Sequence, residues 1–326
     1  MIDKSDDCRC NHVKPAKGTV KSMKQDCLSA PDRFVYDRTE AMSFIKEMPK
    51  LRETVDKIPD EEGLILFGKA SPSREALIIL EREIRRLSED NHKVSLLMAD
   101  LRSGSGAAFQ PAIPMCSQST IKAIYAGALL ESHPAALPEN RQDLYDSIVL
   151  SSNEAYARLR ETYGKAVLEK WCMEAGVDLS FARDFYPRGN TARDMFKMWT
   201  KLYCFLNSKN QPKELTIWLS ESIASATRES LGDRYPVQTK AGWECGLDES
   251  LDYDPEAVIP ADFTDGDPLN DECAINDTGI VYTDQGPYLF VIYTDHPFGV
   301  FRNRMSENPL PDLVKSLCKV KMSMRG

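Results

Sequence analysis

The sequence contains no long apolar run and no surplus of basic residues. The first residues, MIDKSDDCRCNHVKPAKG, are charged and polar where a secretory signal needs roughly 7–15 apolar residues. No other segment approaches the ~20 apolar residues of a membrane helix. The formal net charge is −9, whereas a nucleic-acid partner normally calls for a basic stripe. These absences predict a chain without a signal peptide, a membrane span or a nucleic-acid partner.

Regular spacing of cysteines or metal ligands is also lacking. The nine cysteines are an odd number, and they are scattered along 326 residues rather than concentrated as in a small disulfide-rich domain. Cys8, Cys10 and His12 could bind a metal, but no second ligand pair follows at zinc-finger spacing. We therefore interpret residues 1–38 as a flexible leader and expect neither a metal nor a cofactor.

Apolar residues are abundant enough for a full core. They make up 42% of the chain, which fits one large domain or two intimate ones. Helical patterns cover residues 39–57 and 72–90, and Ser71 is placed to cap the second helix. The buried face of that helix is expected to carry Ile78, Leu80, Ile84 and Leu87.

Strand patterns surround a helical middle section. Residues 93–101, the turn residues SGSG and the segment AAFQPAI predict a hairpin, and residues 119–206 are helical in pattern. Later strands and a final helix are predicted at 235–243, 273–283, 286–294 and from about Asp312. This order predicts an α+β fold, an antiparallel five-stranded sheet flanked by helices with an inserted all-helical subdomain. The predicted subdomains are 39–113 plus 210–326 for the sheet and 114–209 for the helices.

One candidate nucleophile opens the apolar pattern IKAIYAGALL. Ser119 and Lys122 are three residues apart, so on a helix the hydroxyl and the amine share a face and can meet. A serine hydroxyl is a poor nucleophile until a base takes its proton, and a buried lysine with a depressed pKa can be that base. Ser117 competes as a nucleophile, but only Ser119 has the lysine spacing.

Two more short motifs follow in the chain. The motif SSN at 151–153 lies between two helical patterns, where a hydroxyl could relay a proton and an amide could hold a substrate amide. The motif KAG at 240–242 lies on a predicted strand, where the amine adds positive potential and the glycine lets a substrate backbone approach. Each motif taken alone also fits an ordinary helix junction or strand.

Together the three motifs resemble the class A β-lactamases and D-alanyl-D-alanine peptidases of the penicillin-recognising superfamily. The similarity extends to the segments VSLLMADLRSGS, RQDLYDSIVLSSNEAYARL, YGKAVLEKWCMEAG, TARDM and LFVIYT, and it covers roughly residues 72–326. The resemblance implies a serine hydrolase that forms an acyl-enzyme with a β-lactam, peptide or related amide and needs no cofactor.

The resemblance also implies a role for each matching residue. Ser119 would be the nucleophile, Lys122 its base, and Ser151 the relay of a proton to the leaving amine. The N–H groups of Ser119 and Trp243 would form the oxyanion hole. The substrate-binding residues would be Asn153, Lys240, Gly242 and Trp243.

The sequence departs from the family in two places. The loop GVDLSFARDFYPRGN lacks the E-x-x-L-N motif, whose glutamate activates the deacylating water in the family's β-lactamases. Asp178 or Asp184 could substitute, although a loop aspartate is more often a cap or solvated. Ala241 replaces a hydroxyl residue that helps to bind a substrate carboxylate. We therefore expect slow deacylation.

Several alternatives stay open. A penicillin-binding sensor without turnover would share the same motifs. An esterase or glutaminase on the same fold is a further alternative, although S-x-N in second position argues against the esterase branch, which typically has a tyrosine there. The resemblance implies the cell envelope or the extracellular space, whereas the absence of a visible signal leaves the cytoplasm as the alternative. The sequence does not indicate the oligomeric state.

An acidic insertion separates two of the late strands. Residues 247–272 contain ten acidic residues and no basic one, and without EF-hand spacing a solvated loop is preferred over a calcium site. Cys245 and Cys273 flank the insertion at the ends of strands that we expect to pair. We predict that these cysteines are neighbours, and that they form a disulfide if the protein is exported.

The acidic insertion also predicts a preference for substrates that carry a free amine. Lys240 is the only lysine or arginine between residues 235 and 300. Uncompensated carboxylates repel an anionic ligand and attract a cationic one, by an amount that salt weakens. Ampicillin-type zwitterions should therefore acylate the protein faster than carbenicillin-type dianions, most of all at low salt. Stopped-flow acylation at two salt concentrations measures the ratio, and an equal or salt-independent rate would contradict the prediction.

Overall fold

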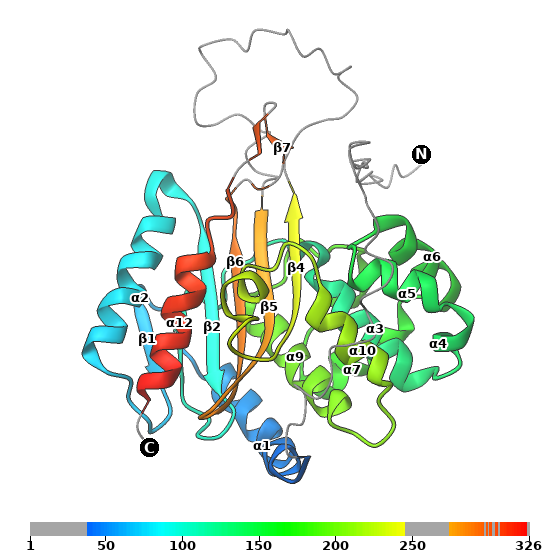
Figure 1. Cartoon of the computed structure of the whole chain (residues 1–326), viewed down its shortest axis with the longest axis horizontal. Helices are drawn as coiled ribbons and strands as arrows, with labels where there is room; N and C mark the ends of the chain where they lie inside the picture. The colour runs from blue at the N-terminus through cyan, green and yellow to red at the C-terminus, as the bar shows by residue number, and fades with distance from the viewer. Residues whose placement is uncertain are drawn as a thin grey trace, which may run out of the picture.

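The computed structural model describes residues 38–244 and 274–324, apart from residues 297, 299, 302, 303 and 306. In this part of the chain, helices cover both faces of an antiparallel sheet (Figure 1). The predicted α+β class is therefore confirmed. The predicted leader lies outside the described residues except for its last residue.

The main sheet has six strands in the order β1-β3-β2-β6-β5-β4, and every neighbouring pair is antiparallel. Its strands are β1 (Leu64–Phe67), β2 (Val94–Asp100), β3 (Gly106–Phe109), β4 (Val237–Glu244), β5 (Ala274–Thr283) and β6 (Gly286–Thr294). A separate ladder joins β7 (Val300–Phe301) and β8 (Arg304–Met305). The predicted number of five strands was wrong by one, because β1 is a four-residue edge strand, LILF, with no alternation to mark it.

Helices occupy most of the remaining described chain. Those before the middle section are α1 (Arg38–Asp56) and α2 (Arg74–Leu87). The middle section contains α3 (Ile121–Ser132), α4 (Ala136–Glu139), α5 (Arg141–Ile148), α6 (Asn153–Tyr163), α7 (Ala166–Ala175), α8 (Ser180–Arg183) and α9 (Ala192–Leu206). The later helices are α10 (Lys213–Glu221), α11 (Ala226–Leu231) and α12 (Pro311–Ser323), and two 3₁₀ turns cover Glu89–Asn91 and Gln118–Thr120. Helices α3 to α7 gather beside the β4 edge of the sheet (Figure 1), while the subdomain boundaries stay a prediction.

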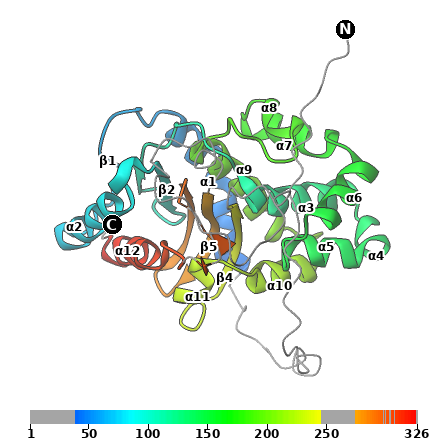
Figure 2. The same cartoon turned by 90° about the horizontal axis from the view of Figure 1, so that it is seen from above.

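The sheet is buried on both faces. Successive strand residues point to opposite faces, so in β2 Leu97 and Ala99 join the core shared with α1 and α9, whereas Leu96 and Met98 join the core under α2 and α12. Figure 2 shows the sheet between these two groups of helices. Two-sided burial explains why all seven residues of β2 are buried and why the apolar residues 96–99 follow one another without alternation.

Helix α2 corrects two details of the sequence prediction. Its N-cap is Ser73 and not Ser71, because the Ser73 side chain accepts a hydrogen bond from the Ala76 N–H at 3.2 Å. Ile78 is 55% exposed, whereas Leu80 is buried. Residues two positions apart on a helix point about 200° apart around its axis, so Ile78 and Leu80 cannot share a face.

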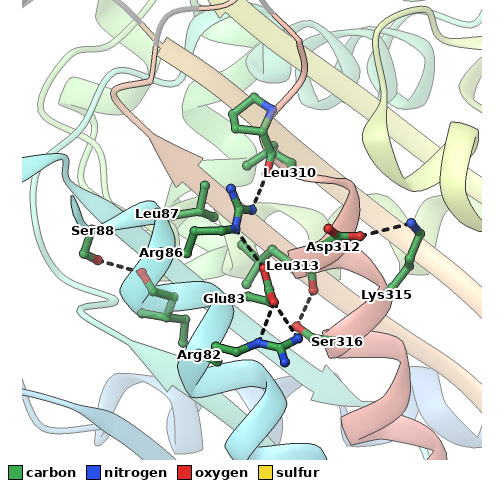
Figure 3. Close-up of polar contacts among 12 residues, drawn as sticks. Arg82, Glu83, Arg86, Leu87, Ser88, Leu310, Asp312, Leu313, Lys315 and Ser316 are labelled. Carbon is green, nitrogen blue, oxygen red and sulfur yellow. Dashed lines mark hydrogen bonds and ion pairs between the residues drawn. The ribbon is translucent and has the colours of Figure 1, made fainter. Parts of the chain in front are cut away.

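Charged groups link α2 to the start of α12 and link α12 to the sheet. The buried Glu83 of α2 accepts hydrogen bonds from Arg82 and Arg86, and Arg86 also donates to the Pro309 carbonyl just before α12 (Figure 3). At the other end of α12, Lys321 forms a buried ion pair of 3.0 Å with Asp100 of β2. A buried ion pair is costly to break by removing one partner, so these contacts hold α12 on the sheet.

A buried and an exposed position can be compared by truncating each side chain to alanine. Leu97→Ala should lower the free energy of unfolding by about 2–5 kcal/mol, because it opens a cavity at a fully buried position. Ile78→Ala is the matched control and should cost less than about 0.5 kcal/mol at its exposed position. Urea unfolding measures the loss of stability in both variants. Equal losses would contradict the assignment of Leu97 to the core and Ile78 to the surface.

Candidate active site

Ser119 lies in a tight turn that leads directly into α3. The residues Gln118–Thr120 form a 3₁₀ turn, and Lys122 follows in the first turn of α3. Gln118 has a φ of +48°, a left-handed conformation that is uncommon for a residue other than glycine. Such backbone strain often occurs at functional sites. The predicted helical spacing of Ser119 and Lys122 is therefore present, with Ser119 8% exposed and Lys122 fully buried.

Ser117 is placed differently from Ser119. Its side chain is fully buried, and its hydroxyl donates to the Gln118 carbonyl at 3.4 Å. Its own carbonyl accepts from the Thr120 N–H at 3.2 Å. Ser117 therefore closes the turn, and Ser119 is the better candidate nucleophile.

The buried amine of Lys122 contacts the second motif. Its Nζ donates to the Ser151 carbonyl and to Asn153 Oδ1, each at 2.6 Å. It also lies 5.8 Å from the ring centroid of Tyr156 and 5.6 Å from that of Tyr186. The S-x-x-K and S-x-N motifs are thus brought into direct contact by one side chain.

Ser151 lies between α5 and α6 and contacts both lysines of the site. Its φ of +59° is again left-handed, while the next residue, Ser152, caps α6 by accepting from the Ala155 N–H at 3.1 Å. The Ser151 carbonyl faces Lys122, and its hydroxyl accepts a hydrogen bond from Lys240 Nζ at 2.9 Å. The helix junction therefore places Ser151 between two amines, with its carbonyl on Lys122 and its hydroxyl on Lys240.

Strand β4 supplies the third motif along one face. Residues two apart on a strand share a face, and Lys240, Gly242 and Glu244 all point toward the first two motifs. A Cβ added to Gly242 would lie 2.7 Å from the Ser119 nitrogen, so any side chain there would collide with the turn. Glu244 accepts a hydrogen bond of 2.6 Å from Gln118 Nε2. Glycine at 242 is therefore required for β4 to lie against Ser119.

Trp243 follows Gly242 and is partly buried. Its ring centroid lies 5.8 Å from Lys240 Nζ and 6.3 Å from that of Phe298. Ala241, where the family has a hydroxyl residue, is fully buried, and its carbonyl accepts from Lys240 Nζ at 2.8 Å. The indole thus borders the Lys240 amine, while Ala241 offers no hydroxyl.

Burial changes the ionisation of Lys240 and of a carboxylate that sequence reasoning missed. Burial lowers the pKa of Lys240 to about 7, an effect that the Asp277 carboxylate opposes. Burial also raises the pKa of Asp277 to about 6, against hydrogen bonds from Thr227 and Ser225 and the charge of Lys240. Asp277 lies opposite Ala241 on β5, and its Oδ1 has no hydrogen-bond partner among the described residues. Near neutral pH the Lys240 amine can therefore hold or release a proton.

Six of the seven predicted residues belong to the three motifs, and close contacts link these motifs through Lys122, Ser151, Asn153, Lys240 and Gly242. Trp243 borders this group through Lys240. Tyr186 was missed, although its hydroxyl donates to Asn153 Oδ1 at 2.7 Å. It belongs to the loop segment FYPRGN, which carries no motif, so only the folded chain reveals its contact.

The proposed substitutes for the family's glutamate, Asp178 and Asp184, are both solvent-exposed. Asp178 accepts a hydrogen bond from the N–H of Ser180, the first residue of α8, at 2.8 Å. Asp178 is thus a local cap.

Other sequence predictions lie outside the described residues. These are the Cys8, Cys10 and His12 cluster, the acidic residues 247–272, and the Cys245–Cys273 pair. Within the described ranges, no group of three or more His, Cys, Asp or Glu residues could hold a metal ion. No helix in these ranges is both long and apolar enough to cross a membrane.

The fold and the three converging motifs define a penicillin-recognising serine hydrolase superfamily protein. The model of the beta-lactamase enzyme family matches residues 133–309, more than half of the chain, so the protein belongs to that family. The match includes Ser151, Asn153 and Lys240, but it begins after Lys122. The placement of Ser119 and Lys122 therefore depends on the geometry described above.

A solved structure shows the same fold. The crystal structure of a beta-lactamase from Desulfarculus baarsii DSM 2075 is similar to this chain with a TM-score of 0.52 and 16% sequence identity, over 76% of this chain and 97% of that chain. No curated protein matches the chain. The family and the shared fold together indicate a hydrolase of the serine β-lactamase type.

The buried Asp277 predicts a pH dependence of stability. Its folded pKa of about 6 exceeds the 3.8 of an unperturbed aspartate, so the folded state holds the proton more tightly. The stability from this group is present below about pH 4 and is lost as pH rises to about 6. Asp277→Asn should remove this loss, so its unfolding free energy should rise relative to wild type by roughly 1–3 kcal/mol between these pH values.

Urea unfolding at pH 4, 5, 6 and 7 tests this expectation. Asp233→Asn is the control, because Asp233 is an exposed carboxylate just after α11. Its difference from wild type should stay flat. A flat or falling difference for Asp277→Asn would refute the buried-carboxylate account.

Proposed function

We propose that this chain is a serine hydrolase that forms an acyl-enzyme on Ser119 with a β-lactam, a peptide or a related amide. The observation that carries the proposal is the position of Lys122. It follows Ser119 by three residues, and its amine is hydrogen-bonded to Ser151 and Asn153 of the second motif. A buried amine in such a place can take the serine proton while the hydroxyl oxygen attacks a carbonyl.

The hydrogen bonds of Lys122 favour this role as a base. A neutral lysine amine has two N–H groups and one lone pair. The Ser151 carbonyl and Asn153 Oδ1 can accept the two N–H groups, which leaves the lone pair to receive the Ser119 proton. The resulting ammonium keeps both bonds and faces two aromatic rings, which stabilise a cation.

The leaving group then needs a proton, and Ser151 can relay it. In this proposal the Ser151 hydroxyl gives its proton to the leaving nitrogen as the carbon–nitrogen bond breaks, and it regains one from Lys240, whose Nζ donates to it at 2.9 Å. A pKa of about 7 makes Lys240 able to give up a proton at neutral pH. Its ammonium form also attracts a substrate carboxylate.

Substrate binding is assigned to the Ser119 turn and β4. The N–H groups of Ser119 and Trp243 would stabilise the oxyanion, and such donors are typically worth 10²–10³ in rate. The close approach of Gly242 to the Ser119 nitrogen supports this pairing of turn and strand. The amide of Asn153 would hold the substrate amide.

We also propose that deacylation is slow. The loop that carries a glutamate in the family's β-lactamases places Tyr186 against Asn153 instead, and Asp178 and Asp184 are exposed. The same observation favours a second candidate function, a penicillin-binding sensor that is acylated without turnover. The number of turnovers per molecule separates the two functions.

Ser119→Ala should abolish covalent labelling by a fluorescent penicillin without unfolding the protein, because only the attacking oxygen is lost. Ser117→Ala is the matched control and should keep the label. Lys122→Ala should slow acylation by on the order of 10²–10⁴-fold, the usual size of a general-base effect. Gel fluorescence measures labelling, and circular dichroism checks the fold. A label that persists in Ser119→Ala would refute the proposed nucleophile, and an unchanged rate in Lys122→Ala would remove that residue from the mechanism.

A further inference from the structure

Tyr186 contacts the active site from outside the three motifs. It lies in the segment between α8 and α9, and its hydroxyl donates to Asn153 Oδ1 at 2.7 Å. Its ring centroid lies 5.6 Å from Lys122 Nζ. One side chain of this loop therefore contacts both Asn153, the proposed substrate-binding residue, and Lys122, the proposed base.

The Asn153 oxygen is shared by two donors. Lys122 Nζ donates to it at 2.6 Å and the Tyr186 hydroxyl at 2.7 Å. A carbonyl oxygen has two lone pairs, so these bonds satisfy it completely. In the proposed mechanism the Lys122 lone pair is directed at Ser119, so toward Asn153 the amine can only donate, and a flipped amide would place an NH₂ group against it. The two donors therefore fix which end of the carboxamide faces inward, and the Nδ2 end faces the other way.

The segment that carries Tyr186 is itself held in place on both sides. Before it, Arg160 donates to the Ala182 carbonyl at 3.0 Å and the Tyr156 hydroxyl donates to the Phe185 carbonyl at 3.4 Å. After it, the Ser117 N–H donates to the Pro187 carbonyl at 3.2 Å. The buried Arg160 also lies 5.1 Å from the Phe185 ring centroid. The phenol is thus supported by a fixed backbone.

We propose that Tyr186 is a positioning residue that orients the Asn153 carboxamide, so that Nδ2 is presented to the carbonyl of the substrate. This inference rests on the proposed function of Asn153 as a substrate ligand. Tyr186 takes no part in proton transfer in this account. Its loss should weaken substrate binding more than it slows the acylation step.

The test is a double-mutant cycle of Tyr186→Phe and Asn153→Ala, read by stopped-flow acylation with a penicillin. Tyr186→Phe keeps the ring against Lys122 and removes one hydrogen bond, so the second-order rate constant should fall by about 5- to 10-fold, mainly through weaker binding. In the Asn153→Ala background the same change should cost less than about 2-fold, because the oriented amide is gone. Equal losses in both backgrounds would overturn the proposal.

Tyr163→Phe is the control, because it removes a phenol that also bonds an asparagine. The Tyr163 hydroxyl accepts from Asn140 Nδ2 at 2.7 Å, at the opposite end of α6 from Asn153. Its acylation rate should stay within about 2-fold of wild type. A loss as large as that of Tyr186→Phe would show that the effect is not specific to the phenol on Asn153 and would overturn the proposal.

Urea unfolding of the same four proteins separates this inference from the proposed function. If no penicillin acylates the wild type, the proposed function fails, and the unfolding cycle then decides the role of Tyr186. Tyr186→Phe should destabilise the protein, raising the equilibrium constant for unfolding by about 5-fold in the wild-type background. In the Asn153→Ala background the rise should be less than about 2-fold. Equal losses in the two backgrounds would show that Tyr186 does not act through Asn153.

Discussion

The fully buried amine of Lys122 is the constraint on which the site depends. An amine without water must find protein acceptors, because leaving it unpaired costs several kcal/mol (on the order of 2–7 for a neutral polar group). The Ser151 carbonyl and Asn153 Oδ1 supply them, and the left-handed backbone of Ser151 turns that carbonyl toward the amine. The helix junction and the loop with Tyr186 are therefore arranged around one nitrogen, whose side chain starts in the turn of chain that follows Ser119.

The sheet contributes a second fixed surface. Strand β4 is the last strand of the sheet, and on one face it carries an amine, a glycine and a carboxylate that contact the other two motifs. Gly242 allows the strand to approach the Ser119 nitrogen, and Lys240 reaches Ser151. The sheet and the helix junction thus hold different sides of the site. Functional groups placed on such elements keep their geometry more accurately than groups on loops.

Much of the fold was predictable because local patterns determine it. The strands β2 to β6 were marked by apolar runs and turn residues, and the Ser119 and SSN positions by their places at helix starts. The edge strand β1 was missed because four residues show no period. Ile78 was placed wrongly in the core because apolar character alone does not say which helix face is covered.

Local spacing alone predicts only the pairing of Ser119 with Lys122, and the meeting of the three motifs was expected from the family resemblance. Ser119 and Lys122 are three apart, so helix geometry joins them. Tyr186 is 33 residues from Asn153 along the chain, and Asp277 meets Ser225 and Thr227 across a gap of 50 residues or more. Such contacts depend on how the loop and the sheet pack, which a single sequence does not encode in any local period.

The central claim is that Ser119 becomes acylated and releases its acyl group slowly. Time-resolved intact-mass spectrometry with a panel of β-lactams, followed by peptide mapping, measures the adduct, its site and its lifetime together. The account predicts one adduct per molecule with the mass of the intact antibiotic, on the peptide that contains Ser119, persisting well after acylation is complete. An adduct at another residue, or no adduct with any member of the panel, would contradict it.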